Sequence, residues 1–377
     1  MHKLLEFNQK ELKLKTTDWL SLCNYRTCDH SPSLKLKKCT LILSFLFFCI
    51  LGCENKRVVQ RDDLIILKGT AIGTTWTVQA FSPDNIQVDE LRNDILKKLD
   101  ETDKIFSSSR PNSALHLFND LSSNSIVSID PKLHELLEHA KWMHDQSLGA
   151  FDPTIAPLVN LWTFESGRSG PTIPNEEKII AGLSLVGFEK LKLFSKGKAQ
   201  KMNPDLQVDL SGSAKGEIVD QLCLLLSRWG LKNYLIEIGG KIRAQGRGKD
   251  GKGWIVELED EAIINKSMLE SVSLRNYSLA SSGTTRIEHS NTDLKKKSGL
   301  LLDPRTGRPV SNNLVAVHAF SPMARDADAW ATALMILGVE EGVRIAEKMD
   351  LVARFCVKDG NKITQIYSQA FQRIYFQ

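Results

Sequence analysis

One stretch in the middle of the chain constrains the fold most, because it changes from strand to helix and back within a short distance. The pattern predicts a strand, a small-residue turn, a helix and a second strand, at residues 207–210, 211–213, 215–229 and 233–238. Gly239 and Gly240 then end the second strand. A helix between two strands buries its apolar face against a sheet. The sequence therefore predicts an α+β fold in which helices pack on antiparallel or mixed sheets.

Similar patterns recur along the chain. Two strands near the start flank a glycine-containing turn at residues 69–73, which is typical of a hairpin. Asp130 and Pro131 form a predicted helix start, with Asp130 as the N-cap. The further predicted strands are at 64–67, 75–79, around Trp254, around Leu274, at 314–320 and at 353–357, and the further helices are at 88–102, 131–147, 324–338 and 340–350.

The composition is that of an ordinary globular protein. The chain has 377 residues, of which 42% are hydrophobic and 25% charged, enough for one large domain or two closely packed lobes. The formal net charge is only +4, and the lysines are scattered or gathered in short runs such as residues 295–297. Nucleic-acid binding needs a concentrated basic surface, so we expect no nucleic-acid partner.

A basic and then apolar segment near the N-terminus resembles the signal peptide of a bacterial lipoprotein. Lysines gather in residues 34–38, residues 39–51 are apolar, and Cys53 follows. We expect residues 34–53 to be the signal, with Cys53 as the lipidated residue and residues 1–33 as an upstream leader or a misassigned start. A retained membrane-spanning helix is the alternative, but the apolar run is shorter than the ~20 residues that cross a bilayer.

This interpretation sets the remaining boundaries and the expected location. Residues 54–63 are predicted to be a polar tether, and residues 64–377 one domain. The protein would be exported and lipid-anchored to a bacterial membrane on the periplasmic side, with the inner membrane favoured over the outer one.

The predicted helix at residues 324–338 carries two oxygen ligands on one face. Asp328 and Thr332 are four residues apart, which places them on the same side of a helix. Carboxylate and hydroxyl oxygens suit magnesium, which prefers oxygen ligands and keeps several waters. The spacing alone favours a simpler alternative, in which Asp326 and Asp328 only stabilise the helix N-terminus.

Two other segments have the composition of ligand-binding loops. In residues 208–216 a strand runs into a small-residue turn and a helix, so backbone groups can approach an anion and Lys215 can contact a phosphate. Residues 149–162 concentrate glycine, proline, aspartate and aromatic residues, as rigid irregular loops do. The first segment fits an ordinary strand-to-helix turn equally well, and the apolar groups of the second are equally consistent with a core.

Taken together and in order, these segments resemble the ApbE family of FAD:protein FMN transferases, over about residues 68–348. The matching blocks follow the family's order and lie at residues 72–74, 106–113 with Asn119, 151–162, 209–216 with Asp220, 236–240, 281–283, 303–309 and 327–332. The resemblance implies the ApbE-like flavin transferase fold, with residues 64–377 as a catalytic domain that binds FAD and magnesium.

The resemblance also implies two groups of site residues. Magnesium, the expected cofactor, would bind the backbone of Gly212 and the side chains of Asp328 and Thr332. The residues expected to contact FAD, the substrate, are Ile72, Ser109, Ala150, Phe151, Asp152, Asp209, Lys215 and Leu302. The implied reaction cleaves the FAD diphosphate, attaches FMN to a threonine of an exported acceptor protein and releases AMP.

One departure from the family pattern bears on the transfer step. Leu300 stands where the family has a histidine, the expected base for the acceptor threonine, and leucine cannot take a proton. The catalytic residue is therefore unknown. His289 and His318 are the nearest alternatives, but their predicted loop and strand positions are more typical of solvated or structural histidines. The alternative function is an FAD-binding protein, or an FAD pyrophosphatase that forms FMN and AMP without transfer.

Three other positions differ from the family pattern. Ser109 replaces an aromatic residue, Lys241 replaces the acidic residue that follows two glycines, and Thr284 stands where aspartate is frequent. These differences predict weaker or altered FAD binding. A third interpretation is a flavin-free lipoprotein that uses the fold only for protein contacts, and the retained Asp328 and Thr332 argue against it.

Overall fold

The computed structural model of the chain describes residues 63–82, 86–164, 174–258, 270–283, 301–360 and 362–376. The chain divides into two units, Met1–Gln60 and Arg61–Gln377, and all the described residues belong to the second. The predicted leader, signal, Cys53 and nearly all of the tether lie outside the described residues. Across the described ranges, no helix has the length and apolar character needed to cross a membrane.

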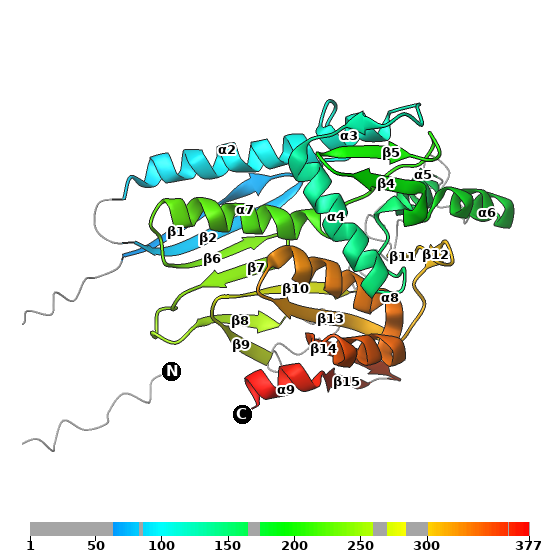
Figure 1. The fold of residues 1–377 in the computed structure, drawn as a ribbon. Helices are drawn as coiled ribbons and strands as arrows, with labels where there is room; N and C mark the ends of the chain where they lie inside the picture. Colours follow the sequence, from blue (N-terminus) through cyan, green and yellow to red (C-terminus); the bar gives the residue numbers. More distant parts are fainter. Residues whose placement is uncertain are drawn as a thin grey trace, which may run out of the picture. The chain divides into compact units, whose positions relative to one another are not determined.

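An antiparallel sheet forms the centre of the second unit (Figure 1). Within the described residues it has eight strands, and each neighbouring pair is antiparallel. In spatial order they are β1 (Asp63–Ala71), β2 (Thr74–Ser82), β6 (Asn233–Ile238), β7 (Lys241–Gln245), β10 (Tyr277–Gly283), β13 (Leu314–Ser321), β14 (Val352–Asp359) and β15 (Lys362–Tyr367). The predicted hairpin near the start of the chain is confirmed as β1 and β2.

The turn between β6 and β7 depends on paired glycines. Gly239 and Gly240 have φ angles of 53° and 81°, in the left-handed region that glycine adopts without a steric penalty. Ile238 pairs directly with Lys241 across this turn. The glycines therefore determine that Lys241 is the first residue of β7.

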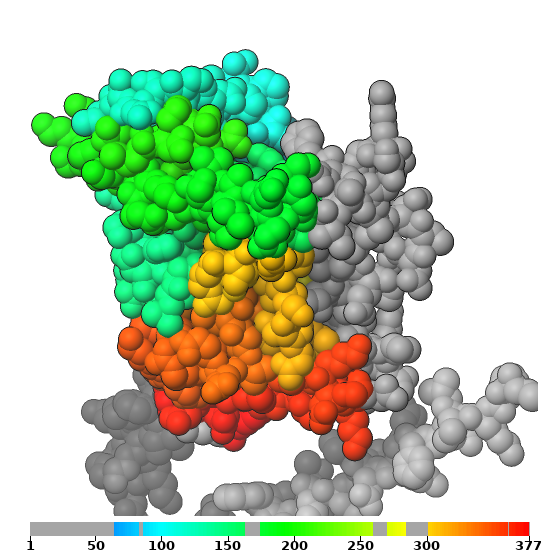
Figure 2. All heavy atoms as spheres, turned by 90° about the vertical axis from the view of Figure 1, so that its right-hand side faces the viewer, coloured from blue at the N-terminus to red at the C-terminus, as the bar shows by residue number. Residues whose placement is uncertain are grey.

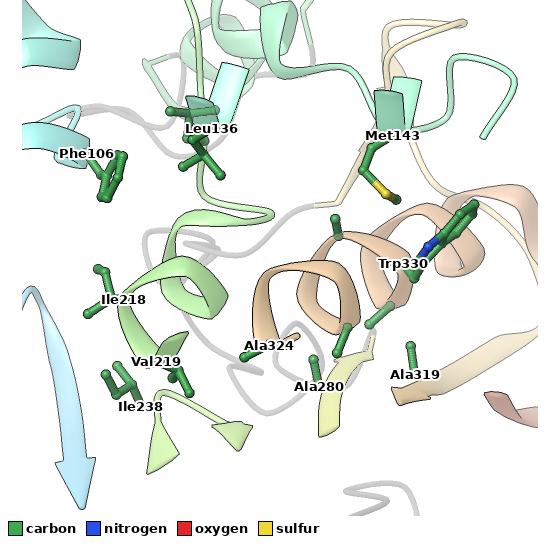
Figure 3. Close-up of a cluster of buried hydrophobic side chains, with 14 of the residues drawn as sticks. Phe106, Leu136, Met143, Ile218, Val219, Ile238, Ala280, Ala319, Ala324 and Trp330 are labelled. Atoms are coloured by element: carbon green, nitrogen blue, oxygen red, sulfur yellow. The ribbon is translucent and has the colours of Figure 1, made fainter. Parts of the chain in front are cut away.

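Within the described residues, three long helices cover one face of the sheet: α2 (Val88–Phe106), α7 (Ala214–Arg228) and α8 (Ala324–Lys348). Figure 3 shows Ala280 of β10 and Ala319 of β13 beneath α8, where small side chains let the helix lie close to the strands. The predicted helices at 324–338 and 340–350 are joined as one element with a break at Gly338, whose φ is 79°.

The other face of the same strands carries a second core. Neighbouring residues of a strand point to opposite faces, so Ile236 lies in the first core and Leu235 in the second. The second core is completed by β8 (Trp254–Leu258), β9 (Glu270–Leu274) and α9 (Gln369–Tyr375). Helix α9 is absent from the predicted elements because its buried pair, Ala370 and Phe371, is too short a pattern to show a period.

Helix α4 (Pro131–Gln146) joins the covering helices to a smaller sheet, because it contacts α2, α8 and β4. Asp130 caps α4 as predicted, accepting hydrogen bonds from the backbone N–H groups of the second and third helical residues. The other elements of this region are α3 (Ala114–Asn119), β3 (Val127–Ser128), η1 (Pro153–Ile155), α5 (Ala156–Phe164), α6 (Glu176–Leu185), η2 (Phe188–Lys190), β4 (Leu191–Phe194) and β5 (Lys198–Lys201).

The short hairpin of β11 (Leu302–Asp303) and β12 (Arg308–Pro309) packs on the α5–α6 region. Figure 2 shows this segment, in yellow, between the green α5–α6 region and the orange α8. The Trp162 Nε1 group donates a hydrogen bond to the carbonyl of Gly307 at 2.9 Å. This contact ties the predicted 303–309 turn to the loop region that begins at residue 149.

The predicted strand at residues 207–210 is wrong. The backbone of this segment hydrogen-bonds to a side chain that is distant in the sequence. The Asn119 side chain donates to the Val208 carbonyl at 2.9 Å and accepts from the Val208 N–H at 2.8 Å. The Asp209 N–H donates to the Pro153 carbonyl at 2.7 Å. The segment is therefore held by α3 and by the loop at residues 150–155 and not by a neighbouring strand.

Candidate functional site

A cleft of about 950 Å³ lies where β6, β7, β8 and β10 meet α8 and two loops. The loops are residues 150–155 and 209–212, which the Asp209–Pro153 hydrogen bond joins. Of the residues expected to bind FAD or magnesium, those lining the cleft are Ala150, Phe151, Asp152, Asp209, Gly212, Lys215, Leu302, Asp328 and Thr332. The structure thus brings together segments from four separate parts of the sequence.

The turn at residues 209–213 leads directly into α7. The Asp209 carboxylate accepts a hydrogen bond from the Ser211 N–H at 2.7 Å, which closes the turn. A Cβ on Gly212 would lie 3.0 Å from the Phe151 ring and 3.6 Å from the Thr332 Oγ1 atom. The absence of a side chain at this position lets the turn approach α8, so two of the expected magnesium ligands are neighbours.

The starts of α7 and α8 touch each other closely. A Cβ on Gly216 would lie 2.3 Å from the Ala324 carbonyl oxygen, a distance that only glycine tolerates. Asp220 of α7 accepts hydrogen bonds from the Ala324 and Arg325 N–H groups, each at 3.0 Å. Burial raises the pKa of Asp220 to about 6, although these two backbone hydrogen bonds lower it.

Asp328 makes the reciprocal contact from α8. Its Oδ2 atom accepts a hydrogen bond from the Gly216 N–H at 3.0 Å, and its side chain is 1% exposed. Its Oδ1 atom lies 2.9 Å from the Lys241 Nζ atom, which also donates to the Ser281 carbonyl at 2.9 Å. Asp328 is therefore a buried carboxylate with a positively charged partner at the wall of the cleft.

A second charged pair borders the cleft at the loop that follows α4. The Asp152 Oδ1 atom accepts hydrogen bonds from the N–H and hydroxyl groups of Thr154, at 2.8 and 2.6 Å. The Asp152 Oδ2 atom lies 3.4 Å from the His144 Nδ1 atom. This carboxylate raises the pKa of His144, against the opposing effect of burial.

Two expected FAD contacts do not line the cleft. Ile72 lies in the turn between β1 and β2, with a φ of 48°, and Ser109 follows α2. The β1–β2 turn still comes near the cleft, because a Cβ on Gly239 would lie 2.9 Å from the Thr74 hydroxyl and 3.3 Å from the Lys215 side chain. The turn that contains Ile72 thus neighbours the site, whereas Ser109 lies outside the residues that line it.

The cleft also contains residues that the motifs did not assign. Glu237 lies inside a matched block, and its Oε1 atom accepts a hydrogen bond from the Gly240 N–H at 2.7 Å. The alternation of β2 and β6 could have pointed to Thr77, Gln79 and Glu237 as one face of the sheet. Only the three-dimensional structure shows the contact of Lys241 with Asp328.

The model of the ApbE family matches residues 72–355, most of the chain. The chain belongs to the ApbE family. It is 30% identical over 338 residues to the FAD:protein FMN transferase of Escherichia coli (strain K12), covering 88% of this chain and 95% of that protein. It is 31% identical over 334 residues to the protein of the same name from Buchnera aphidicola subsp. Schizaphis graminum (strain Sg), covering 87% and 96%.

Solved ApbE structures share the fold. The flavin transferase ApbE from Vibrio cholerae superposes with a TM-score of 0.75 at 30% identity, covering 82% of this chain and 99% of that one. The apo form of the flavinyl transferase ApbE from Pseudomonas stutzeri gives a TM-score of 0.75 at 30% identity, covering 85% and 99%. The predicted α+β class and ApbE-like fold are confirmed, and the chain is a member of an enzyme family.

The magnesium ligands expected from the ApbE resemblance meet in the structure but do not fit a divalent ion well. Asp328 is the one charged group of the three, and its two oxygens are engaged by Lys241 and by the Gly216 N–H. The Thr332 hydroxyl donates to the Asp328 carbonyl at 3.1 Å. Across the described residues, no three His, Cys, Asp or Glu side chains are grouped so that they could hold a metal ion.

Proposed function

We propose that this chain is an FAD:protein FMN transferase that binds FAD in the cleft and attaches FMN to a threonine of an exported acceptor protein. One observation carries the proposal: a single cleft gathers every expected FAD contact except Ile72 and Ser109. The names of the relatives support the choice of substrate and of a protein acceptor.

The proposed reaction exchanges a phosphoanhydride bond for a phosphoester bond. The bond between the FMN phosphorus and the bridging oxygen of the FAD diphosphate breaks, and AMP leaves with that oxygen. The threonine oxygen forms the new bond to the same phosphorus, and its proton passes to solvent or to the AMP phosphate. Positively charged groups on the diphosphate stabilise such a transfer, and Lys215, which lines the cleft, supplies one such charge in this proposal.

Magnesium dependence stays a prediction of the family resemblance. A magnesium ion at Asp328 and Thr332 would supply positive charge to the diphosphate. The ion pair between Lys241 and Asp328 speaks against this arrangement, because an ion bound to Oδ1 would have to displace the ammonium group.

Hydrolysis of FAD to FMN and AMP is the second candidate, and Leu300 is the observation that favours it. Leu300 lies outside the described residues, as does His289. His318 is fully buried in β13, and its Nδ1 atom lies 3.3 Å from an Arg354 nitrogen. His318 is not among the residues that line the cleft, which supports its interpretation as a structural histidine rather than a replacement base.

Incubation of the purified full chain with FAD and a threonine-bearing acceptor domain separates these functions. An increase in acceptor mass equal to one FMN, together with AMP release, supports transfer. AMP release without the mass increase supports hydrolysis. A chain that neither binds flavin nor releases AMP contradicts both and favours the interpretation as a flavin-free scaffold.

A matched pair of lysines tests whether the cleft is the site. Lys215→Met removes a positive charge from the cleft, and we expect it to lower AMP release by about tenfold or more. Lys232→Met removes an exposed charge just after α7 and should leave AMP release unchanged. Equal effects of the two variants would contradict the placement of the diphosphate near Lys215.

We also propose export and lipid anchoring at Cys53, on the periplasmic side of the membrane. The signal-like pattern of residues 34–53 supports this proposal. Cys53→Ser should abolish incorporation of a labelled fatty acid and release the protein from the membrane fraction, whereas Cys223→Ser should change neither. A chain that stays membrane-bound and unlabelled in both forms would instead support a retained membrane helix.

A further inference from the structure

We propose that the ammonium group of Lys241 is a built-in cation that takes the place of a divalent metal ion at Asp328 and contacts the FAD diphosphate together with Lys215. The second half of this proposal, the contact with the diphosphate, rests on the proposed binding of FAD in the cleft. The first half, the replacement of a metal ion by Lys241, concerns only this chain and a metal ion.

The backbone places the lysine with little freedom. The two glycines of the β6–β7 turn make Lys241 the first residue of β7, and that residue is only 8% exposed. Its Nζ atom is held from two sides, by the Asp328 Oδ1 atom and by the Ser281 carbonyl, both at 2.9 Å. These contacts come from α8 and β10, so the ammonium is fixed between three separate elements.

The same contacts leave the ammonium able to bind an anion. An ammonium group has three N–H donors, and the two described partners use two of them. Lys241 lines the cleft, as does Lys215, whose Nζ atom donates to the Ser211 carbonyl at 3.1 Å. Two lysines at one cleft supply positive charge comparable to that of a divalent ion.

The arrangement also disfavours a metal ion at Asp328. Magnesium binds carboxylate oxygens at about 2.0–2.1 Å and needs the lone pairs that face it. The Lys241 ammonium already occupies the approach to Oδ1, and the Gly216 N–H occupies Oδ2. A metal ion would therefore have to expel a buried ammonium that would lose its charged partner, which is unfavourable.

Lys241 is also where the sequence departs from its family. The resemblance leads one to expect an acidic residue after the two glycines, and an acidic side chain beside Asp328 would attract a divalent ion. A lysine reverses the sign of the charge at that position. The change of residue and the observed ion pair thus point to the same conclusion.

Titration with Mn²⁺ tests the metal half of the proposal on the purified full chain without flavin. We expect Lys241→Asp to bind Mn²⁺ at least about tenfold more tightly than the wild type, because the repelling charge is gone and a carboxylate is added. Adding Asp328→Asn to Lys241→Asp should remove the gain. Calorimetry and the electron paramagnetic resonance signal of free Mn²⁺ both measure this binding.

The wild-type chain decides the metal question even if Lys241→Asp does not fold. The proposal is overturned if the wild type binds one Mn²⁺ per chain and loses that binding in Asp328→Asn. Lys241→Gln keeps a donor for Asp328 without the charge, and it provides a milder comparison in which tighter Mn²⁺ binding is again expected.

Flavin binding in the presence of EDTA tests the diphosphate half. We expect the wild type to bind FAD equally well in EDTA and in Mg²⁺, measured by flavin fluorescence. Lys241→Gln should weaken the binding of FAD about tenfold but not that of riboflavin, which has no diphosphate. Loss of wild-type FAD binding in EDTA, or equal losses for FAD and riboflavin, would contradict this half.

The Mn²⁺ titration and the FAD-binding measurement distinguish a failure of the proposed function from a failure of the proposed role of Lys241. If the wild type binds no FAD under any condition, the proposed function fails, and the Mn²⁺ titration still shows whether Lys241 excludes a metal ion. If FAD binds only with Mg²⁺, the proposed function stands and the role of Lys241 as the replacing cation is wrong.

Discussion

Two buried carboxylates at the junction of α7 and α8 make the same kind of contact but have different roles. Asp220 of α7 accepts hydrogen bonds from the first N–H groups of α8, and Asp328 of α8 accepts one from the Gly216 N–H of α7. Both therefore place a carboxyl group at the N-terminus of the other helix, where negative charge and acceptors are favourable.

The surroundings separate the two roles. Asp220 does not line the cleft, and burial raises its pKa to about 6. Asp328 lines the cleft and has the Lys241 ammonium at 2.9 Å. The comparison indicates that Asp220 holds the helices together, whereas Asp328 holds the Lys241 ammonium at the wall of the cleft.

The largest expected effect comes from Asp328→Ala, which leaves the Lys241 ammonium buried without its charged partner. Such an uncompensated charge costs about 3–5 kcal/mol. We expect this loss in the free energy of unfolding, measured by urea denaturation. The double variant Asp328→Ala/Lys241→Met removes both charges and should recover a large part of the loss. A double variant that is less stable than Asp328→Ala would show that the ion pair is not the cause.

Asp220→Ala should give the next largest loss of stability. Two N–H groups at the start of α8 lose their acceptor, which costs about 2–3 kcal/mol in the free energy of unfolding. We expect FAD affinity at a temperature where the variant is folded to stay close to that of the wild type. Leu224→Ala, at an exposed position of the same helix, is the control and should change stability little. A selective loss of FAD affinity in Asp220→Ala would erase the distinction between the two carboxylates.

The sequence predicted most of the sheet and its long helices because their apolar spacing is regular. Leu91, Ile95 and Leu99 of α2 are all buried, as their spacing of four predicts. The strand predicted at 207–210 failed because Asn119, far away in the chain, takes the hydrogen bonds that a neighbouring strand would have made. Local pattern carries no information about such a contact.

Some features of the candidate site could likewise be predicted from the sequence, and others could not. The motifs around Phe151, Asp209 and Asp328 could be assigned from sequence because each is a contiguous block, and the structure brings them to one cleft. The ion pair of Lys241 with Asp328 joins β7 to α8, and no spacing relates the two. The sequence showed that Lys241 was unusual, and only the fold shows what its charge contacts.

The pH dependence of the free energy of unfolding tests whether Asp220 is a buried carboxyl group that differs from Asp328. Its pKa rises from 3.8 to about 6 on folding, so between these values the folded state binds more protons than the unfolded state. The stability contributed by the protonated carboxyl is therefore present below pH 3.8 and decreases as the pH rises towards 6. Relative to Asp220→Asn, the wild type should lose on the order of 2 kcal/mol across this window. A flat difference between the two proteins would show that burial does not raise this pKa.

The smallest expected effect is at His144, beside Asp152, a third buried carboxylate that lines the cleft. Asp152 raises the pKa of His144, so the ion pair contributes stability at pH values below the ordinary histidine pKa of 6.5 and loses it as the pH rises through the folded value. Because the His144 side chain is partly exposed, we expect less than about 1 kcal/mol between wild type and His144→Gln at low pH, and no difference at high pH. Urea denaturation across this range measures the difference, and the imidazole proton resonance that disappears in His144→Gln reports the pKa directly. A resonance that titrates below 6.5 would mean that burial outweighs Asp152, and this end of the cleft would then carry a neutral histidine.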